Sequence, residues 1–215
     1  MFARFRRGQP AQDLTHASNL IKLPEPIHES DTAVERALLY RKSIRSYRHE
    51  PLELSDIAQL LWAAQGITRP GGYRTAPSAG ALYPLEVYLL AGNVSDLKDG
   101  LYKYRPLTHE LEQVLEVDKR TELSKAALNQ ESIQDAPAVI ILCADYERTK
   151  GKYGERGEQY VHMEVGSAAQ NVYLQAVSLD LGTVFIGAFY DEEVKKVLEI
   201  GGNEEPLCIL PIGRP

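Results

Sequence analysis

Cysteine is scarce in this sequence, and histidine is not clustered. The two cysteines, Cys143 and Cys208, each lie inside an apolar run. We expect both to be small buried side chains, not a disulfide or a metal-binding pair, as is typical of proteins in the reducing cytoplasm. The five histidines are scattered and no His-Glu-x-x-His pattern occurs, so the sequence predicts no metal site.

Long hydrophobic runs and an excess of positive charge are also missing. No apolar segment approaches the roughly 20 residues that cross a bilayer. The cations of residues 1–7 are not followed by the apolar segment of a secretory signal. Lysine and arginine number 24 against 30 acidic residues, and this net charge of -6 argues against nucleic-acid and membrane partners. We therefore expect a cytoplasmic globular protein.

The common phosphate-binding and hydrolase motifs are absent. Neither Gly-x-x-x-x-Gly-Lys-Ser/Thr nor Gly-x-Gly-x-x-Gly occurs, so a mononucleotide would have to be bound in another way. Residues 76–80, Ala-Pro-Ser-Ala-Gly, match a nucleophile elbow poorly, because Ala76 stands where that turn needs glycine and no strand is predicted before it. A serine hydrolase is therefore disfavoured.

A basic segment, residues 41–47 (Arg-Lys-Ser-Ile-Arg-Ser-Tyr), is the most distinctive feature that is present. Apolar residues of 33–40 recur at helical spacing, so we expect a helix that ends at this segment. Arginine binds phosphate bidentately, lysine adds a point charge and serine adds a hydroxyl donor, which together suit a single phosphate group. The alternative is a solvated basic turn that pairs with Glu50 or Glu53.

Helical and extended patterns alternate along the rest of the chain. Residues 1–31 are polar and contain several prolines, so we expect an arm on the body or on a partner subunit, followed by one domain over 32–215. Residues 68–84 and 146–156 are predicted loops, and residues 146–158 are a candidate mobile lid. Periodicity predicts helices over 54–66, 121–129, 159–181 and 191–200, and strands over 85–90, 100–105, 111–117, 138–144, 182–189 and 207–212. The alternation predicts an α+β layered sheet.

Five segments, taken in order, resemble the nitroreductase-like flavoproteins, and within them the SagB-type dehydrogenases, whose azoline-oxidising members act on modified peptides. The segments are residues 41–47, 74–84 (Arg-Thr-Ala-Pro-Ser-Ala-Gly-Ala-Leu-Tyr-Pro), 166–171, 182–189 and 210–215. Order and spacing agree from about residue 36 to the end. The resemblance implies a nitroreductase-like layered fold with a central, mostly antiparallel sheet flanked by helices. It also implies an intertwined homodimer with two FMN molecules at the subunit interface.

The resemblance further implies which residues bind FMN. Arg41 and Ser43 would hold the phosphate with Lys42 nearby, and Arg45 would approach the pyrimidine edge of the ring. A cation fixed at that edge stabilises the negative charge of the reduced ring. Arg214 near the C-terminus is a further phosphate-binding candidate.

Two more groups of residues would contact the ring itself. One group is a loop poor in side chains that would come from the other subunit, and the second would lie along the opposite side of the ring, with an amide of Gly187 or Ala188 facing flavin N5. The first group is Pro77, Ser78, Ala79, Gly80 and Leu82, and the second is Phe185, Ile186, Gly187 and Ala188.

The activity that the resemblance implies is an FMN-dependent oxidoreductase with a ping-pong mechanism. NADH or NADPH would give hydride and leave, and a small organic acceptor (a nitroaromatic, quinone or enone) would take the electrons in the same cavity. The cofactor carries this chemistry, so no catalytic side chain is assigned.

Two alternatives stay open. The first is a SagB-type azoline dehydrogenase that acts on a peptide or heterocyclic substrate. For its catalytic Lys-Tyr pair, Lys152 and Tyr153 are the only adjacent candidates in a plausible segment. The second is a flavin-binding module without turnover. In addition, Ser167 stands where relatives often have histidine, which bears on substrate choice.

Overall fold

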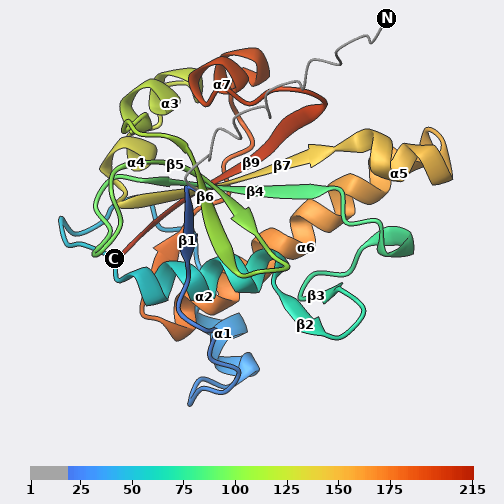
Figure 1. The fold of residues 1–215 in the computed structure, drawn as a ribbon. Helices are drawn as coiled ribbons and strands as arrows, with labels where there is room; N and C mark the ends of the chain where they lie inside the picture. The colour runs from blue at the N-terminus through green and yellow to red at the C-terminus, as the bar shows by residue number, and fades with distance from the viewer. Residues whose placement is uncertain (1–18) are drawn as a thin grey trace, which may run out of the picture.

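A seven-stranded sheet runs through the centre of the computed structural model, which describes residues 19–215 (Figure 1). The strand order is β1-β6-β5-β4-β7-β9-β8, and every pairing between these strands is antiparallel. The strands are β1 (Leu20–Lys22), β4 (Leu85–Ala91), β5 (Gly100–Arg105), β6 (Glu110–Leu115), β7 (Ala138–Asp145), β8 (Gly182–Thr183) and β9 (Glu204–Gly213). The predicted antiparallel central sheet is therefore confirmed.

Helices cover both faces of this sheet, so the α+β layered fold is confirmed (Figure 1). One face packs against α2 (Leu54–Gln65) and α6 (Arg156–Ser178), and the other against α3 (Arg120–Ala126), α4 (Glu131–Asp135) and α7 (Asp191–Val197). Helix α1 (Val34–Tyr40) packs on α6. Strand β7 lies between β4 and β9, and its residues 138–144 are all buried. This two-sided burial explains why that strand is continuously apolar and does not alternate.

The longest helix, α6, has the periodicity that predicted it. Val161, Val165, Ala168, Val172 and Ala176 are all buried against the sheet and α2. A stripe at this spacing lies on one face of a helix. Helix α6 is therefore the spine of one half of the core.

The N-terminal arm is partly built into the sheet. Residues 1–18 lie outside the described part of the chain, but β1 pairs with the edge strand β6, and Leu23 is buried. The carbonyl of Pro24 can only accept, so Nε2–H of His109 donates to it, and Nδ1 then accepts from the Tyr104 hydroxyl; both distances are 2.9 Å. Burial lowers the pKa of His109, which favours this neutral form.

Two expected loops contain regular structure. Residues 146–156 were expected to be a loop, but α5 (Tyr146–Tyr153) begins there because the Asp145 side chain caps it by accepting from the Glu147 amide at 3.1 Å. Within 68–84 the chain forms the hairpin β2 (Ile67–Arg69) and β3 (Tyr73–Arg74), followed by the short 3₁₀ helix η1 (Ala79–Ala81). The charge of the first segment and the glycine content of the second had led to the prediction of loops in both places.

The strand expected over 182–189 is shorter than predicted. Only β8 continues the sheet ladder, and Ile186 forms an isolated bridge with Ile209. The amide of Phe185 donates to the Tyr173 hydroxyl at 2.7 Å instead of joining a neighbouring strand. The strand therefore ends before Phe185, because the Phe185 amide bonds to a side chain of α6 and not to a neighbouring strand.

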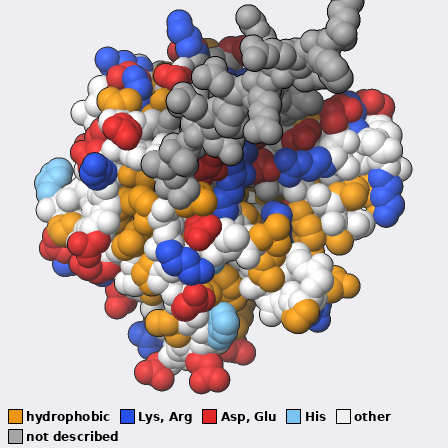
Figure 2. Space-filling view, viewed as in Figure 1, with side chains coloured by type: hydrophobic (Ala, Val, Ile, Leu, Met, Phe, Trp, Pro, Cys, Tyr) orange, Lys and Arg blue, Asp and Glu red, His pale blue; other side chains and the backbone are white. Residues whose placement is uncertain are grey.

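The surface of α1 is unusually apolar. Val34, Leu38, Leu39 and Tyr40 are all exposed, Leu39 by 76%. Figure 2 shows hydrophobic side chains gathered on the lower half of this face, in the region of α1, α2 and the β2–β3 hairpin. Exposed apolar side chains gathered in one region are typical of an interaction surface. Within residues 19–215, no helix combines the length and the apolar character needed to cross a bilayer.

Candidate cofactor site

The basic segment is attached to the edge of the sheet. The Ile44 amide donates to the Thr183 carbonyl at 2.8 Å, and Ser43 lies opposite Thr183 in a parallel bridge. Residues 41–47 therefore begin where α1 ends and lie beside 182–185, although about 140 residues separate the two segments in the chain. Two of the segments predicted to bind the cofactor are brought together by this contact.

Tyr173 of α6 organises this corner. Its hydroxyl accepts from the Phe185 amide at 2.7 Å and lies 3.1 Å from Ser43 Oγ. Since the hydroxyl hydrogen remains free, Tyr173 can donate it to Ser43 and leave the serine hydrogen for a ligand. The Arg41 guanidinium lies over the Tyr173 ring, 5.0 Å from its centroid.

Sequence reasoning did not identify Tyr173. It belongs to the helical pattern of α6, and nothing in its neighbourhood along the chain signals Ser43, which lies 130 positions away. Only the folded chain reveals this contact.

The cations of the basic segment have no acidic partner. Within residues 19–215, no carboxylate lies within ion-pair distance of Arg41, Lys42 or Arg45. Glu53 instead accepts a hydrogen bond from the Ser95 hydroxyl at 3.2 Å. The alternative interpretation, a turn neutralised by Glu50 or Glu53, is therefore wrong for this structure. Cations held together without a counter-charge fit an anionic group such as a phosphate.

Arg214 lies near this segment but is engaged elsewhere. Its carbonyl accepts from the Arg48 amide at 2.9 Å, which places the C-terminus beside the basic segment. Its guanidinium pairs with Asp56 of α2 at 3.2 Å. Burial raises the pKa of Asp56, and the charge of Arg214 opposes that rise. The assignment of Arg214 to a phosphate stays a prediction, and this ion pair competes with it.

Residues 185–188 offer free backbone donors beside the basic segment. Phe185, Gly187 and Ala188 are exposed, whereas the Ile186 side chain is buried in the core. In the described part of the chain, the amides of Gly187 and Ala188 make no hydrogen bond. Ile186 can therefore contact a ligand only through its backbone, while the next two amides are available to an acceptor such as a ring nitrogen.

The loop 77–80 lies at a different part of α6. Gly80 has a φ of 64°, and a Cβ there would lie 2.8 Å from the Tyr153 hydroxyl and 2.9 Å from Lys152 Nζ, so glycine lets the loop pack on α5. Ser78 Oγ accepts from the Tyr83 amide at 2.9 Å, and Ala79 and Leu82 are half-buried. The exposed Pro77 and Gly80 complete the loop.

Helix α6 separates the two groups of predicted residues. The loop 77–80 packs near Glu164, and Ser43 and Phe185 lie at Tyr173, nine positions further along the helix. At 1.5 Å per residue this is about 13 Å along the axis. The structure thus brings Arg41, Ser43 and 185–188 together within one chain and places the loop 77–80 apart from them.

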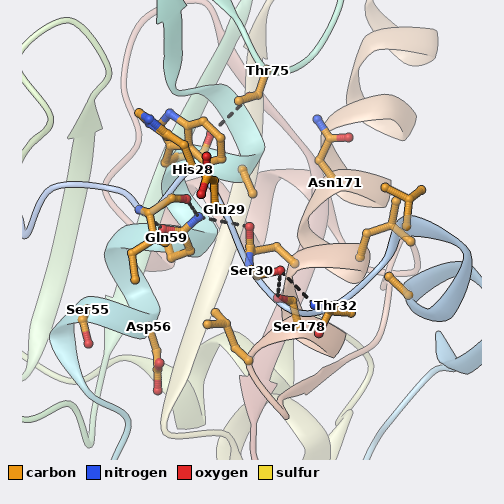
Figure 3. Close-up of a pocket in the computed structure, with 18 of the residues that line it drawn as sticks. His28, Glu29, Ser30, Thr32, Ser55, Asp56, Gln59, Thr75, Asn171 and Ser178 are labelled. Carbon is orange, nitrogen blue, oxygen red and sulfur yellow. Dashed lines mark hydrogen bonds between the residues drawn. The ribbon is translucent and has the colours of Figure 1, made fainter.

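A cavity of about 680 Å³ lies between the arm, α2 and α6 (Figure 3). His28 and Ser30 of the arm, with Thr32 just after it, face Gln59 of α2 and Ser178 of α6, and the Ser178 hydroxyl donates to that of Ser30 at 3.3 Å. None of the residues predicted to bind the cofactor lines it.

Gly182 makes the contact between the basic segment and the sheet possible. A Cβ at this position would lie 2.6 Å from Cγ1 and 2.7 Å from Cβ of Ile44, close to its branch point. We expect Gly182→Ala to destabilise the protein by about 1–3 kcal/mol because the β-branched Ile44 cannot move aside. Gly201→Ala is the matched control, since a Cβ there meets nothing within 4 Å. Equal urea midpoints for the two variants would contradict this expectation.

Comparison with known proteins identifies the class. The Nitroreductase family matches residues 38–214. The crystal structure of a Ralstonia eutropha protein, provisionally named a nitroreductase, superposes with a TM-score of 0.81 at 31% identity, covering 91% of this chain and 89% of that one. The Methanocaldococcus jannaschii protein MJ1384, also provisionally named a nitroreductase, is 47% identical over 194 residues, 90% of this chain and 96% of that protein. The fold is that of a nitroreductase-like oxidoreductase. The chain belongs to the nitroreductase family.

Two other relatives bear on the chemistry. The Escherichia coli microcin B17-processing protein McbC is 31% identical over 155 residues, which are 69% of this chain and 57% of McbC. The chain thus aligns with less than two thirds of McbC. The FMN reductase (NADPH) of Bacillus subtilis is 29% identical over 116 residues, 47% of each protein.

Proposed function

We propose that this protein is an FMN-dependent oxidoreductase that takes hydride from NADH or NADPH and passes the electrons to a small organic acceptor. The observation that carries the proposal is the group formed by Arg41 and the Ser43 hydroxyl at Tyr173, together with the free amides of Gly187 and Ala188, which follow the Phe185 amide bound by Tyr173. An anionic tail would bind Arg41 and the Ser43 hydroxyl, and a ring with acceptor atoms would accept from the two amides. The relatives that are named nitroreductases and FMN reductases favour the same cofactor.

The chain's own residues would bind and polarise the cofactor. Arg41, Lys42 and Ser43 would neutralise and hydrogen bond the phosphate, and Arg45 would stabilise negative charge that develops at the ring edge. Bound FMN would supply the transfer of the electron pair. The amide of Gly187 or Ala188 would hold the ring in register by donating to it. This arrangement needs no side-chain nucleophile.

We propose that the working unit is a homodimer. The loop 77–80 lies about 13 Å along α6 from the phosphate-binding group, so the second copy would bring its own loop to complete the site. The exposed apolar residues of α1 provide a surface suited to that second copy.

An absorbance spectrum followed by anaerobic titration with NADH and with NADPH tests the proposal. We expect the purified protein to show flavin bands and at least one nucleotide to bleach them. Adding a nitroaromatic, quinone or enone should then restore the bands. A colourless protein that does not bind added FMN would overturn the proposal. A yellow protein that neither nucleotide reduces would favour a flavin-binding module without turnover.

A second function, oxidation of an azoline ring, is favoured by the position of Lys152 and Tyr153. Both side-chain termini lie against Gly80, in the loop proposed to reach the cofactor of the other subunit. An amine and a phenol at such a place could remove the ring C–H proton that this oxidation releases. The similarity to McbC agrees with this reading.

Separate variants distinguish the two functions. If the pair acts as the base, we expect Lys152→Ala and Tyr153→Phe each to lower the rate of azoline oxidation by at least about 100-fold. Reduction of FMN by a nicotinamide should continue in both variants. Lys150→Ala, on the same helix and paired with Glu155, is the control. If wild-type protein leaves a thiazoline peptide unchanged under air, the dehydrogenase reading is wrong.

A further inference from the structure

Glu164 of α6 is a buried acid that the proposed function leaves without a role. It is 3% exposed and is the only Asp, Glu, Lys or Arg side chain of the described residues that is fully buried. It lies beneath the loop 77–80, next to Ser78. Acidic side chains are seldom buried unless a paired charge or a specific task holds them there.

The groups around Glu164 come from three other elements. Ser78 precedes η1, Arg74 belongs to β3 and Gln65 ends α2. Beyond them, the charged or titratable groups Glu86, Arg148, Tyr83 and Tyr104 act on Arg74. The nearest opposite charge is therefore that of Arg74.

Arg74 is held by other partners and does not pair with Glu164. Its Nη1 donates to Gln65 Oε1 at 2.8 Å, and its guanidinium stacks over the Tyr83 ring at 4.6 Å. Glu164 Oε1, Arg74 Nε and Gln65 Nε2 are all buried without a hydrogen-bond partner. A carboxyl in such surroundings is not locked in its charged form. Burial raises the pKa of Glu164 to about 7, against the opposing effects of Ser78, Arg74 and Gln65.

Ser78 has one hydrogen to donate. Its oxygen already accepts from the Tyr83 amide. An ionised Glu164 can only accept, so it draws the serine hydrogen inward, whereas a protonated Glu164 can itself donate to the serine oxygen. We propose that Glu164 is a positioning residue whose protonation turns the Ser78 hydroxyl hydrogen from the protein interior toward the bound cofactor. The proposal rests on the proposed function, because the loop 77–80 is taken to contact FMN.

Binding of FMN to the cofactor-free full-length protein tests this proposal. Quenching of FMN fluorescence gives the Kd between pH 6 and 8.5. The FMN phosphate itself titrates near pH 6, so the informative quantity is the ratio of wild-type Kd to that of Glu164→Gln at each pH. Glutamine can donate to Ser78 at every pH, as the protonated acid does. We expect the ratio to rise about five- to tenfold across this range, the value of one hydrogen bond.

Two further variants keep the test decisive. Ser78→Ala should bind FMN more weakly than wild type at pH 6 and should lose the additional pH dependence. Glu158→Gln removes an exposed charge from the same helix and should behave as wild type. A ratio that stays constant, or a Ser78→Ala variant that keeps the pH dependence of wild type, overturns the role of Glu164 alone. Failure of wild type to bind FMN at any pH overturns the proposed function as well.

Discussion

Replacing Arg41 and Ser43 together by alanine is expected to weaken FMN binding by at least about 100-fold while the protein stays folded. A hydrogen bond to a charged group contributes about 1.5–3 kcal/mol, and this variant removes a guanidinium and a hydroxyl that both face the proposed phosphate. Arg41 has no carboxylate partner within residues 19–215, so its removal leaves no buried charge unpaired. Flavin occupancy after purification and the Kd for added FMN measure the effect.

The matched control removes the same groups a few residues further on. Ser46 belongs to the same segment, Arg48 directly follows it, and both are exposed, so the variant with both replaced by alanine loses one hydroxyl and one positive charge. We expect it to retain FMN. If the two double variants lose the cofactor to the same extent, general electrostatic attraction and not a defined phosphate site accounts for binding. Full occupancy in the first variant would remove the phosphate assignment.

Lys103→Met is expected to destabilise the protein by on the order of 3 kcal/mol at pH 7.5. Lys103 Nζ lies 3.1 Å from Glu86 and 2.6 Å from Glu204, and all three side chains are less than one fifth exposed. Removing one partner from a buried ion pair leaves uncompensated charge, which costs about 3–5 kcal/mol. Urea unfolding compares the variant with wild type, and Lys98→Met, at an exposed lysine, is the control.

The difference in free energy of unfolding between wild type and Lys103→Met should become smaller at acidic pH. Burial pushes the pKa of Glu86 up, but Lys103 and Arg148 together bring it below the ordinary value of 4.5. The stabilisation from Glu86 is therefore present above pH 4.5 and is lost as the pH falls through the lower folded value. Wild type therefore loses the stabilisation from ionised Glu86 in acid, whereas the variant, which lacks Lys103, has little of this stabilisation at any pH. A deficit that is as large at pH 4 as at pH 7.5 would contradict this, as would a failure of Glu204→Gln to recover stability in the variant.

The same charge group connects the sheet to the candidate site. Arg148 pairs with Glu86 and also donates to the Tyr83 carbonyl at 3.2 Å, at the end of the segment that begins with the loop 77–80. The chain is thus fixed at Gly80, the last residue of the loop, by packing on α5, and again at Tyr83 by Arg148. A change in this loop after Lys103→Met would appear as weaker FMN binding in addition to lower stability.

The elements that could be predicted from the sequence are those with long, regular patterns. Helix α6 has a regular apolar periodicity and strand β7 has a continuous apolar run, and both were found from these local patterns. Helix α5 was missed because it is polar and short, and its start depends on the Asp145 cap. Residues 185–188 leave the sheet because of the Tyr173 hydroxyl, a partner that the local sequence does not indicate.

The candidate site divides in the same way. The basic segment and the loop 77–80 stand out by composition, and the family resemblance connected them to FMN. Tyr173 and Glu164 were not found, because on a helix they occupy ordinary inward positions, and their roles depend on Ser43 and Ser78 far away in the sequence. Periodicity reports that a side chain faces inward but not which atoms it meets there.

Helix α6 has one more consequence if the dimer forms as proposed. Tyr173 would then serve the cofactor bound by its own chain, while Glu164 would serve the one held by the neighbouring chain. One uninterrupted helix of 23 residues would thus carry a residue for each of the two cofactors. A substitution that shifts α6 would therefore act on both cofactors of the dimer, and not on one alone.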